Sequence, residues 1–187
     1  MHIILKIKGQ KYSKGENVML VIKYFMLFLI LVACTLIGRF LSKKYIYRLN
    51  ELEEMKNALN VFEAKIKFTY EPIPQIFQEM SENIDKNISN IFVNAKNKMQ
   101  DKNASIAWEE ALEQSNTNLT KEDKNVLKSL SKLLGQTDIE GQTSQIEITQ
   151  KFLETQIKQA EEEKRKNEKL YSKLGTTIGL AIVIILA

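Results

Sequence analysis

Neighbouring carboxylates are the residues in this chain whose type could support acid–base chemistry. They occur in three groups, Glu53-Glu54, Glu109-Glu110 and Glu161-Glu162-Glu163. General acid–base catalysis needs its groups to face one substrate, whereas consecutive residues of a helix point in different directions. Solvated helix faces therefore explain these groups better than a catalytic site does.

Other residue types that carry chemistry are scarce. The 187 residues include one cysteine, Cys34, and one histidine, His2, which excludes a disulfide framework, a zinc site of Cys and His ligands, and a Cys-His dyad. The sequence has no G-x-x-x-x-G-K-[ST] loop to bind a nucleotide phosphate and no H-E-x-x-H helix to bind zinc. We therefore predict a non-enzyme that uses no metal, no cofactor and no small-molecule substrate.

Charge and composition narrow the class further. Lys and Arg number 27 against 23 Asp and Glu, and the basic clusters alternate with glutamates. They also lack the aromatic side chains on which nucleic-acid bases stack, so we expect no binding of nucleic acid. Seven glycines, two prolines and 27% charged residues are typical of an all-α protein.

Two apolar segments are predicted to be transmembrane helices. The first, residues 19–41, has Lys23 and Arg39 as its only charges and is long enough to cross a hydrocarbon layer of about 30 Å. A cleaved signal peptide is the alternative, but no A-x-A-like site follows. The second, residues 174–187, is uncharged and short. A buried core helix is its alternative, although Lys173 can extend the span by reaching to the interface.

Basic residues next to both spans predict the orientation. They lie on the side of the intervening domain, residues 42–173, and comprise Arg39, Lys43, Lys44, Arg48, Lys164, Arg165, Lys166, Lys169 and Lys173. The positive-inside rule then places this domain in the cytoplasm and both termini outside. Lysines within residues 1–18 oppose this orientation. We therefore interpret Met19 as the translation start and residues 1–18 as a tail that is dispensable or untranslated, with Met1 as the alternative start.

Helical spacing of apolar residues divides the domain of residues 42–173 into an antiparallel bundle of about six helices. The first continues out of the membrane and ends near Tyr70, because Pro72 and Pro74 follow. Pro74 suits the first turn of the next helix. The last helix is predicted to begin after Asp138 and to run unbroken into the second span.

Helix ends and one aromatic residue are predicted to have structural roles. Asn103 and Thr120 suit N-caps, and Gly135 suits the residue that ends the helix beginning near Thr120. Trp108, the only tryptophan, lies among alanines on one helical face. A large indole with small neighbours is typical of a core anchor.

The junction from Gly135 to Gln142 is the candidate binding site. Two structural interpretations explain part of it, a helix end at Gly135 and a Thr137-x-x-Glu140 capping box. They leave Gly141 unexplained, because a glycine in a helix costs about 1 kcal/mol relative to alanine. Either a close contact with another backbone or a mere flaw in the sequence would explain this glycine. Exposed backbone groups at a helix N-terminus, with polar side chains beside them, suit a partner. The candidate partner-binding residues are Gln136, Asp138 and Gln142.

Several short motifs occur in a fixed order from Met19 to the end of the chain. They are Ile37-Gly38-Arg39, Pro72-Ile73-Pro74, Ala107-Trp108, Leu133-Leu134-Gly135-Gln136-Thr137-Asp138 with Gln142, Glu161-Glu162-Glu163, Leu170-Tyr171 and Leu174-Gly175. Each is weak alone, but together the chain resembles the stage III sporulation protein AB family of endospore-forming bacteria. Residues 1–18 lie outside this pattern.

The resemblance implies a role in endospore formation, in the mother cell membrane facing the forespore. The family looks like the cytoplasmic domain of the type II secretion F or type IV pilus platform protein. By that analogy the chain is a membrane platform that docks a cytoplasmic secretion ATPase, stage III sporulation protein AA, and joins other stage III sporulation channel proteins. The alternative is a membrane-tethered helical adaptor or sensor unrelated to secretion.

Overall fold

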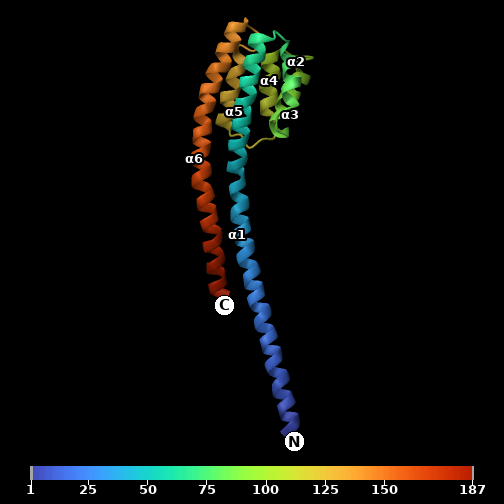
Figure 1. Ribbon diagram of the computed structural model, residues 1–187, viewed down its shortest axis with the longest axis vertical. Coiled ribbons are helices and arrows are strands. Elements are labelled where there is room, and N and C mark those ends of the chain that lie inside the picture. The colour runs from blue at the N-terminus through green and yellow to red at the C-terminus, as the bar shows by residue number, and fades with distance from the viewer. Residues whose placement is uncertain (1, 187) are drawn as a thin grey trace. The chain divides into compact units, whose positions relative to one another are not determined.

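The computed structural model describes residues 2–186, with side chains from residue 18 onward, so Met1 and Ala187 lie outside the described residues. Every regular element in this range is helical, which confirms the predicted all-α class (Figure 1). The elements are α1 (His2–Phe68), α2 (Ile73–Ser81), α3 (Lys86–Lys98), α4 (Ala104–Glu113), α5 (Lys121–Lys128), the 3₁₀ helix η1 (Ser129–Lys132) and α6 (Ile139–Leu186).

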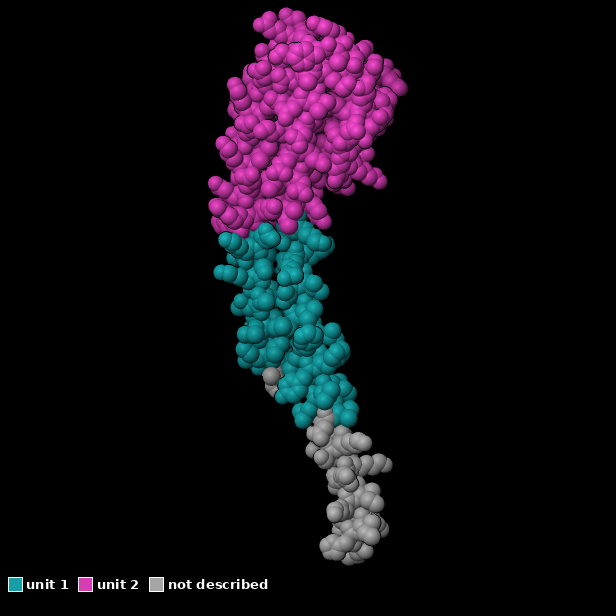
Figure 2. Space-filling model, in the orientation of Figure 1, with its two compact units in different colours: residues 1–43, 167–187 teal, residues 44–166 magenta. Residues whose placement is uncertain are grey.

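The chain forms two compact units, which Figure 2 colours separately. We call residues 44–166 the bundle unit, and residues 1–43 with 167–187 the span unit. Helices α1 and α6 contribute to both units, and α6 runs without a break, as the sequence predicts. Helix α1 begins at His2, within the stretch predicted to be a tail.

Local sequence signals set most helix ends of the bundle unit. Helix α1 ends at Phe68, and Tyr70 has a positive φ of 55° just before Pro72. Asn103 caps α4, because its side chain accepts a hydrogen bond from the Ile106 N–H at 2.9 Å. Each of these ends agrees with the sequence prediction.

The capping box of α5 is complete. The Asp123 N–H donates to Thr120 Oγ1 at 3.2 Å, and the Thr120 N–H donates to Asp123 Oδ2 at 2.8 Å. The helix then ends at Lys128, earlier than the apolar spacing predicts, and continues as η1. Ser129 Oγ donates to the Val126 carbonyl at 2.7 Å within this tighter turn.

Four aromatic rings form the centre of the bundle core. Phe62, Phe77, Phe92 and Trp108, from α1 to α4, are fully buried, with ring centroids 5.2 Å apart for Phe62–Phe77 and Phe77–Phe92. Trp108 lies 5.6 Å from Phe77 and 5.5 Å from Phe92. Such tilted ring pairs add stability beyond the apolar area that they bury.

Within the bundle unit, α1 and α6 run antiparallel. Lys56 pairs with Glu154 at 2.8 Å, and Gln150 Nε2 donates to Asn60 Oδ1 at 3.0 Å. Residue numbers therefore rise along α1 as they fall along α6. Leu153 and Ala160 of α6 belong to the buried core of the bundle unit, as their spacing predicts.

In the span unit, α1 and α6 contact each other through glycines. A Cβ atom at Gly38 would lie 2.5 Å from the Tyr171 carbonyl oxygen, and one at Gly175 would lie 2.8 Å from that of Cys34. The Cα atoms of the two helices thus approach more closely than any larger residue allows. Gly175 and Gly179 have the four-residue spacing found at close membrane helix contacts.

The most apolar stretches of α1 and α6 are long enough to cross a membrane. Their mean hydropathies are 2.6 and 1.5, and only 6% of each stretch is buried within the structure. A core helix would be mostly buried, so the exposed side chains favour a membrane span over the core alternative for the C-terminal stretch.

Candidate functional site

Gly135 begins the junction that the sequence selects as a binding site. Its φ of 69° lies in the left-handed region, which glycine adopts without steric cost. A Cβ atom there would lie 3.2 Å from the Ala104 Cβ and 3.5 Å from Ile73 Cδ1. The junction therefore rests against the first residues of α4 and α2.

Two of the three candidate side chains form hydrogen bonds within the junction. Asp138 Oδ1 accepts from the Gly141 N–H at 2.9 Å and so caps α6. Gln142 Oε1 accepts from the Gly135 N–H at 3.3 Å, while its Nε2 donates to the Thr137 carbonyl at 3.1 Å. Asp138 and Gln142 thus stabilise the shape of the junction itself.

The cap of α6 differs from the predicted Thr137-x-x-Glu140 box. Thr137 Oγ1 donates to Asp138 Oδ1 at 3.3 Å, and Asp138 caps instead. This arrangement also explains Gly141, because a Cβ atom there would lie 2.6 Å from Thr137 Oγ1. Gly141 leaves room for side chains of its own turn rather than for another backbone.

Gln136 differs from its two neighbours in the junction. It is exposed, and its backbone N–H donates to the Leu133 carbonyl at 3.1 Å. Its side chain forms no hydrogen bond with the described residues, so it can contact a partner without loss of an internal bond. Of the three candidates, Gln136 has the geometry best suited to binding.

The residues predicted to be structural lie at defined places. Trp108 is fully buried, and its Nε1 donates to the Leu127 carbonyl at 2.8 Å, which joins α4 to α5. Pro72 is the N-cap of α2, and Pro74 lies in the first turn. Neither proline interrupts a helical hydrogen bond at these positions.

A buried ion pair that sequence reasoning missed joins α1, α5 and α6. Arg48 is 5% exposed and Asp123 is fully buried. The guanidinium binds Asp123 through two hydrogen bonds of 2.8 and 2.9 Å, and Nη1 binds Glu163 at 2.6 Å. Hydrogen bonding to Asp123 raises the pKa of Arg48 despite its burial. The acidic run predicts a solvated Glu163, but this residue has a structural partner and its side chain is only 35% exposed.

Glu51 forms a second buried polar contact, one turn along α1 from Arg48. It is 5% exposed and accepts hydrogen bonds from the Asn118 N–H at 2.6 Å and from Asn118 Nδ2 at 2.8 Å. Asn87 Nδ2 donates to it at 3.0 Å. Glu51 thus holds the α4–α5 connection and the start of α3 against α1.

The paired carboxylates have separate structural partners. Glu54 accepts from the Asp85 N–H at 3.0 Å, and Glu110 pairs with Lys98 at 2.9 Å and Lys102 at 2.6 Å. Among the described residues, no group of three or more His, Cys, Asp and Glu side chains could hold a metal ion.

Comparison with known proteins decides the family. The sequence pattern of the family described as Stage III sporulation protein AB matches residues 23–187. The chain belongs to the stage III sporulation protein AB family. The matched range includes the whole bundle unit, the aromatic core and the candidate junction, and residues 1–22 lie outside it.

Individual relatives agree with this family. The chain is 30% identical over 162 residues to Stage III sporulation protein AB of Bacillus subtilis (strain 168), covering 84% of this chain and 94% of that protein. A solved structure of a stage III sporulation protein AB has a TM-score of 0.60, covers 63% of this chain and 96% of its own, and is 24% identical, so it supports the fold alone. Family membership supports a role in sporulation.

Proposed function

We propose that this protein is a non-catalytic membrane platform of a secretion-like channel complex in the mother cell membrane facing the forespore. There it docks a cytoplasmic secretion ATPase, stage III sporulation protein AA. The observation that carries the proposal is family membership over residues 23–187, a range that joins a helical bundle to two apolar helices. Docking and conformational transmission, rather than bond chemistry, are its mechanism.

Charge next to the apolar stretches supports a cytoplasmic bundle unit. Arg39 lies at the end of the first stretch, Lys43 and Lys44 follow it, and a basic run from Lys164 to Lys173 precedes the second. Membrane insertion keeps such residues on the cytoplasmic side. This orientation gives the bundle access to a cytoplasmic ATPase.

The junction supports a docking role for one surface of the bundle. Asp138 and Gln142 hold its backbone in place, and Gln136 is exposed beside them. A rigid turn with a free side chain binds at a lower entropic cost than a flexible loop does. We therefore propose that Gln136 contacts the ATPase and that Asp138 and Gln142 position it.

Partner recovery tests the platform role. Full-length chain carrying an affinity tag is purified in mild detergent from sporulating cells, and stage III sporulation protein AA is measured by immunoblot. We expect co-purification of the ATPase, at a level reduced by Gln136→Ala. An unrelated soluble protein recovered in its place would favour the adaptor or sensor alternative.

Cysteine labelling tests the orientation. In a Cys34→Ala background, a membrane-impermeant maleimide should label Asn116→Cys only after permeabilisation, because Asn116 is exposed on the bundle unit. The control Leu20→Cys, exposed at the other end of the first apolar stretch and present with either translation start, should react in intact cells. Labelling of Asn116→Cys from outside would overturn the cytoplasmic placement.

A further inference from the structure

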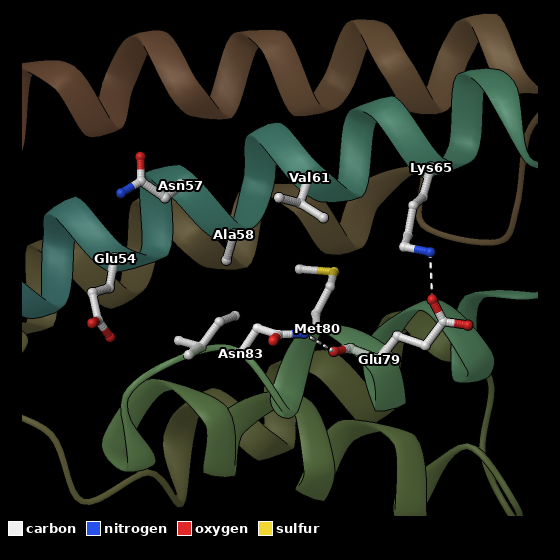
Figure 3. A pocket seen from close by; sticks show the side chains of 9 residues that line it. Glu54, Asn57, Ala58, Val61, Lys65, Glu79, Met80 and Asn83 are labelled. Atoms are coloured by element: carbon white, nitrogen blue, oxygen red, sulfur yellow. Dashed lines mark hydrogen bonds and ion pairs between the residues drawn. The ribbon is translucent and has the colours of Figure 1, made fainter.

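A groove of about 320 Å³ lies between α1 and the end of α2 in the bundle unit (Figure 3). Its walls include Ala58 and Val61 from α1, with Met80 and Ile84 opposite. Ala58 and Met80 are buried, but Val61 is 48% exposed. The groove thus presents an apolar floor to solvent along about 16 Å of α1, from Glu54 to Lys65.

One end of the groove is acidic, and at the other end the charge of a lysine is neutralised. Glu54 lies at one end, and burial raises the pKa of its carboxyl. At the other end Lys65 pairs with both Glu71 and Glu79. The only lysine of the lining is therefore already neutralised by two carboxylates. An apolar segment with a basic residue placed near Glu54 fits this groove best.

The outer face of α6 in the same unit carries the complementary pattern. Ile148 and Phe152, one helical turn apart, are 45% and 57% exposed. Lys151 and Lys158 are exposed and flank them on one side of the helix. Aromatic side chains are enriched at protein–protein interfaces relative to the rest of the protein surface. We call these four residues the α6 ridge.

The α6 ridge and the groove lie at the same level of the bundle unit. Lys56 pairs with Glu154, and Gln150 bonds Asn60, so Phe152 lies at the level of Ala58. By the same antiparallel register Ile148 lies near the level of Val61, and Lys158 within about one turn of Glu54. Copies anchored in one membrane at equal depth would therefore bring the two surfaces together in register.

The groove and the α6 ridge also lie on different sides of α1. Residues of α1 that bond α6 in the bundle unit are not among those that line the groove; they include Arg48, Lys56, Asn60 and Glu63. One copy can therefore offer its ridge to a neighbour and receive another ridge in its groove. Head-to-tail contacts of this kind close into rings when the rotation between copies allows it.

We propose that the groove binds the α6 ridge of a second copy of this chain, with Ile148 over Val61, Phe152 over Ala58 and Lys158 opposite Glu54. The occupant is a protein helix rather than a lipid, because Glu54 would repel an anionic headgroup and Lys65, already paired with two carboxylates, would not attract one. This proposal does not depend on ATPase docking, since neither surface includes the junction at Gly135.

Crosslinking between copies tests the proposal. Full-length Val61→Cys and Ile148→Cys chains, each in a Cys34→Ala background and with a different tag, are co-expressed in sporulating cells. A short bismaleimide is then added to isolated membranes. We expect a dimer that carries both tags, at least fivefold more abundant than with Asn116→Cys in place of Ile148→Cys.

Charge exchange tests the pairing within that contact. Glu54→Lys and Lys158→Glu should each lower the crosslinked dimer at least fivefold, because like charges would then face each other. The combined Glu54→Lys/Lys158→Glu chain should recover to within about twofold of the parent, since the pair is restored in reversed order. Glu53→Lys, which makes the same change at an exposed residue outside the groove, should leave the yield unchanged.

Each other outcome overturns the second-copy assignment. These outcomes are absence of the doubly tagged dimer, failure of the combined exchange to recover it, and a crosslink from Val61→Cys to a different protein in its place. Loss of folding is separated by thermal unfolding of each variant in detergent. All substituted positions are exposed or partly exposed, so midpoints should stay near the parent. The two Glu54→Lys chains both lose the bond from the Asp85 N–H, so only the charge exchange distinguishes their crosslinking.

Discussion

Large side chains separate the helices of the bundle unit, whereas the helices of the span unit meet backbone to backbone. In the bundle, Phe77 and Trp108 lie between helices with ring centroids 5.6 Å apart. In the span unit, a single Cβ atom at Gly38 or Gly175 would come within 2.8 Å of a carbonyl oxygen of the facing helix.

The proposed membrane location of the span unit accounts for this difference. Burial of apolar side chains away from water stabilises a bundle in proportion to area, so large rings are favoured. Two helices in lipid gain little from that effect, because lipid tails are as apolar as leucine, and close van der Waals contact must hold them together. Substitutions should therefore destabilise the two units for opposite reasons. Smaller side chains should destabilise the bundle unit, and larger side chains should disrupt the helix contact in the span unit.

Removal of Trp108 should have the largest effect. Trp108→Ala should lower the free energy of unfolding by about 3 to 5 kcal/mol, because it leaves a cavity and removes the Nε1 hydrogen bond to the Leu127 carbonyl. Urea unfolding of the full chain in detergent, followed by far-UV circular dichroism, measures this loss. The control Trp108→Phe should cost less. A stable Trp108→Ala chain that still blocks sporulation would make the indole a contact residue.

Arg48 tests the charged part of the bundle. Arg48→Met should cost about 3 kcal/mol or more, since it leaves the fully buried Asp123 without its cation. The control Lys56→Met removes a pair with exposed Glu154 and should cost less than about 1 kcal/mol. Equal losses in the two variants, measured by urea unfolding, would show that burial of Asp123 has no energetic consequence.

The single natural cysteine offers a test of the glycine contact. A Cβ atom at Gly179 would lie 3.2 Å from the Cys34 Cβ, just below the range of about 3.5 to 4.5 Å found in disulfides, so a small outward shift of one helix suffices. Gly179→Cys should therefore form an intrachain disulfide on mild oxidation, visible as a mobility shift without reductant. Adding Gly175→Leu should abolish the shift, because the leucine would clash with the Cys34 carbonyl.

The same variants sharpen the contrast between the units. Gly175→Leu should leave the urea unfolding of the bundle unit unchanged, because the glycine lies in the span unit. The matched change Thr176→Leu, at an exposed neighbour, should preserve the disulfide. A persistent disulfide with Gly175→Leu would mean that the span helices do not depend on the glycine contact.

Local signals made much of the fold predictable from sequence. The caps at Asn103 and Thr120 depend on residues three positions away, and apolar spacing gave the buried faces of the helices. The cap of α6 was assigned to Thr137 instead of Asp138, since both residue types can cap and only backbone geometry distinguishes them.

Long-range pairs were not predictable in the same way. Arg48 bonds Asp123 and Glu163, which are 75 and 115 residues away along the chain. The local charge pattern assigns Arg48 to a basic flank and Glu163 to an acidic run. It does not identify their partners, because charge patterns do not encode contacts between distant residues. One usable signal was present in the spans, the Gly175-x-x-x-Gly179 spacing, which is typical of close membrane helix contacts.

The smallest stability effects are expected at the junction, where capping and binding can be separated. Asp138→Ala should cost about 1 kcal/mol, because it removes the cap on the Gly141 N–H. Gln136→Ala should leave the unfolding midpoint and the membrane level unchanged, since its side chain bonds none of the described residues, and should still lower spore yield and ATPase recovery. Exposed Ser144→Ala on α6 is the control for a neutral surface change. Normal sporulation of Gln136→Ala at normal abundance would leave the junction with a structural role alone, because Asp138 and Gln142 are already engaged within it.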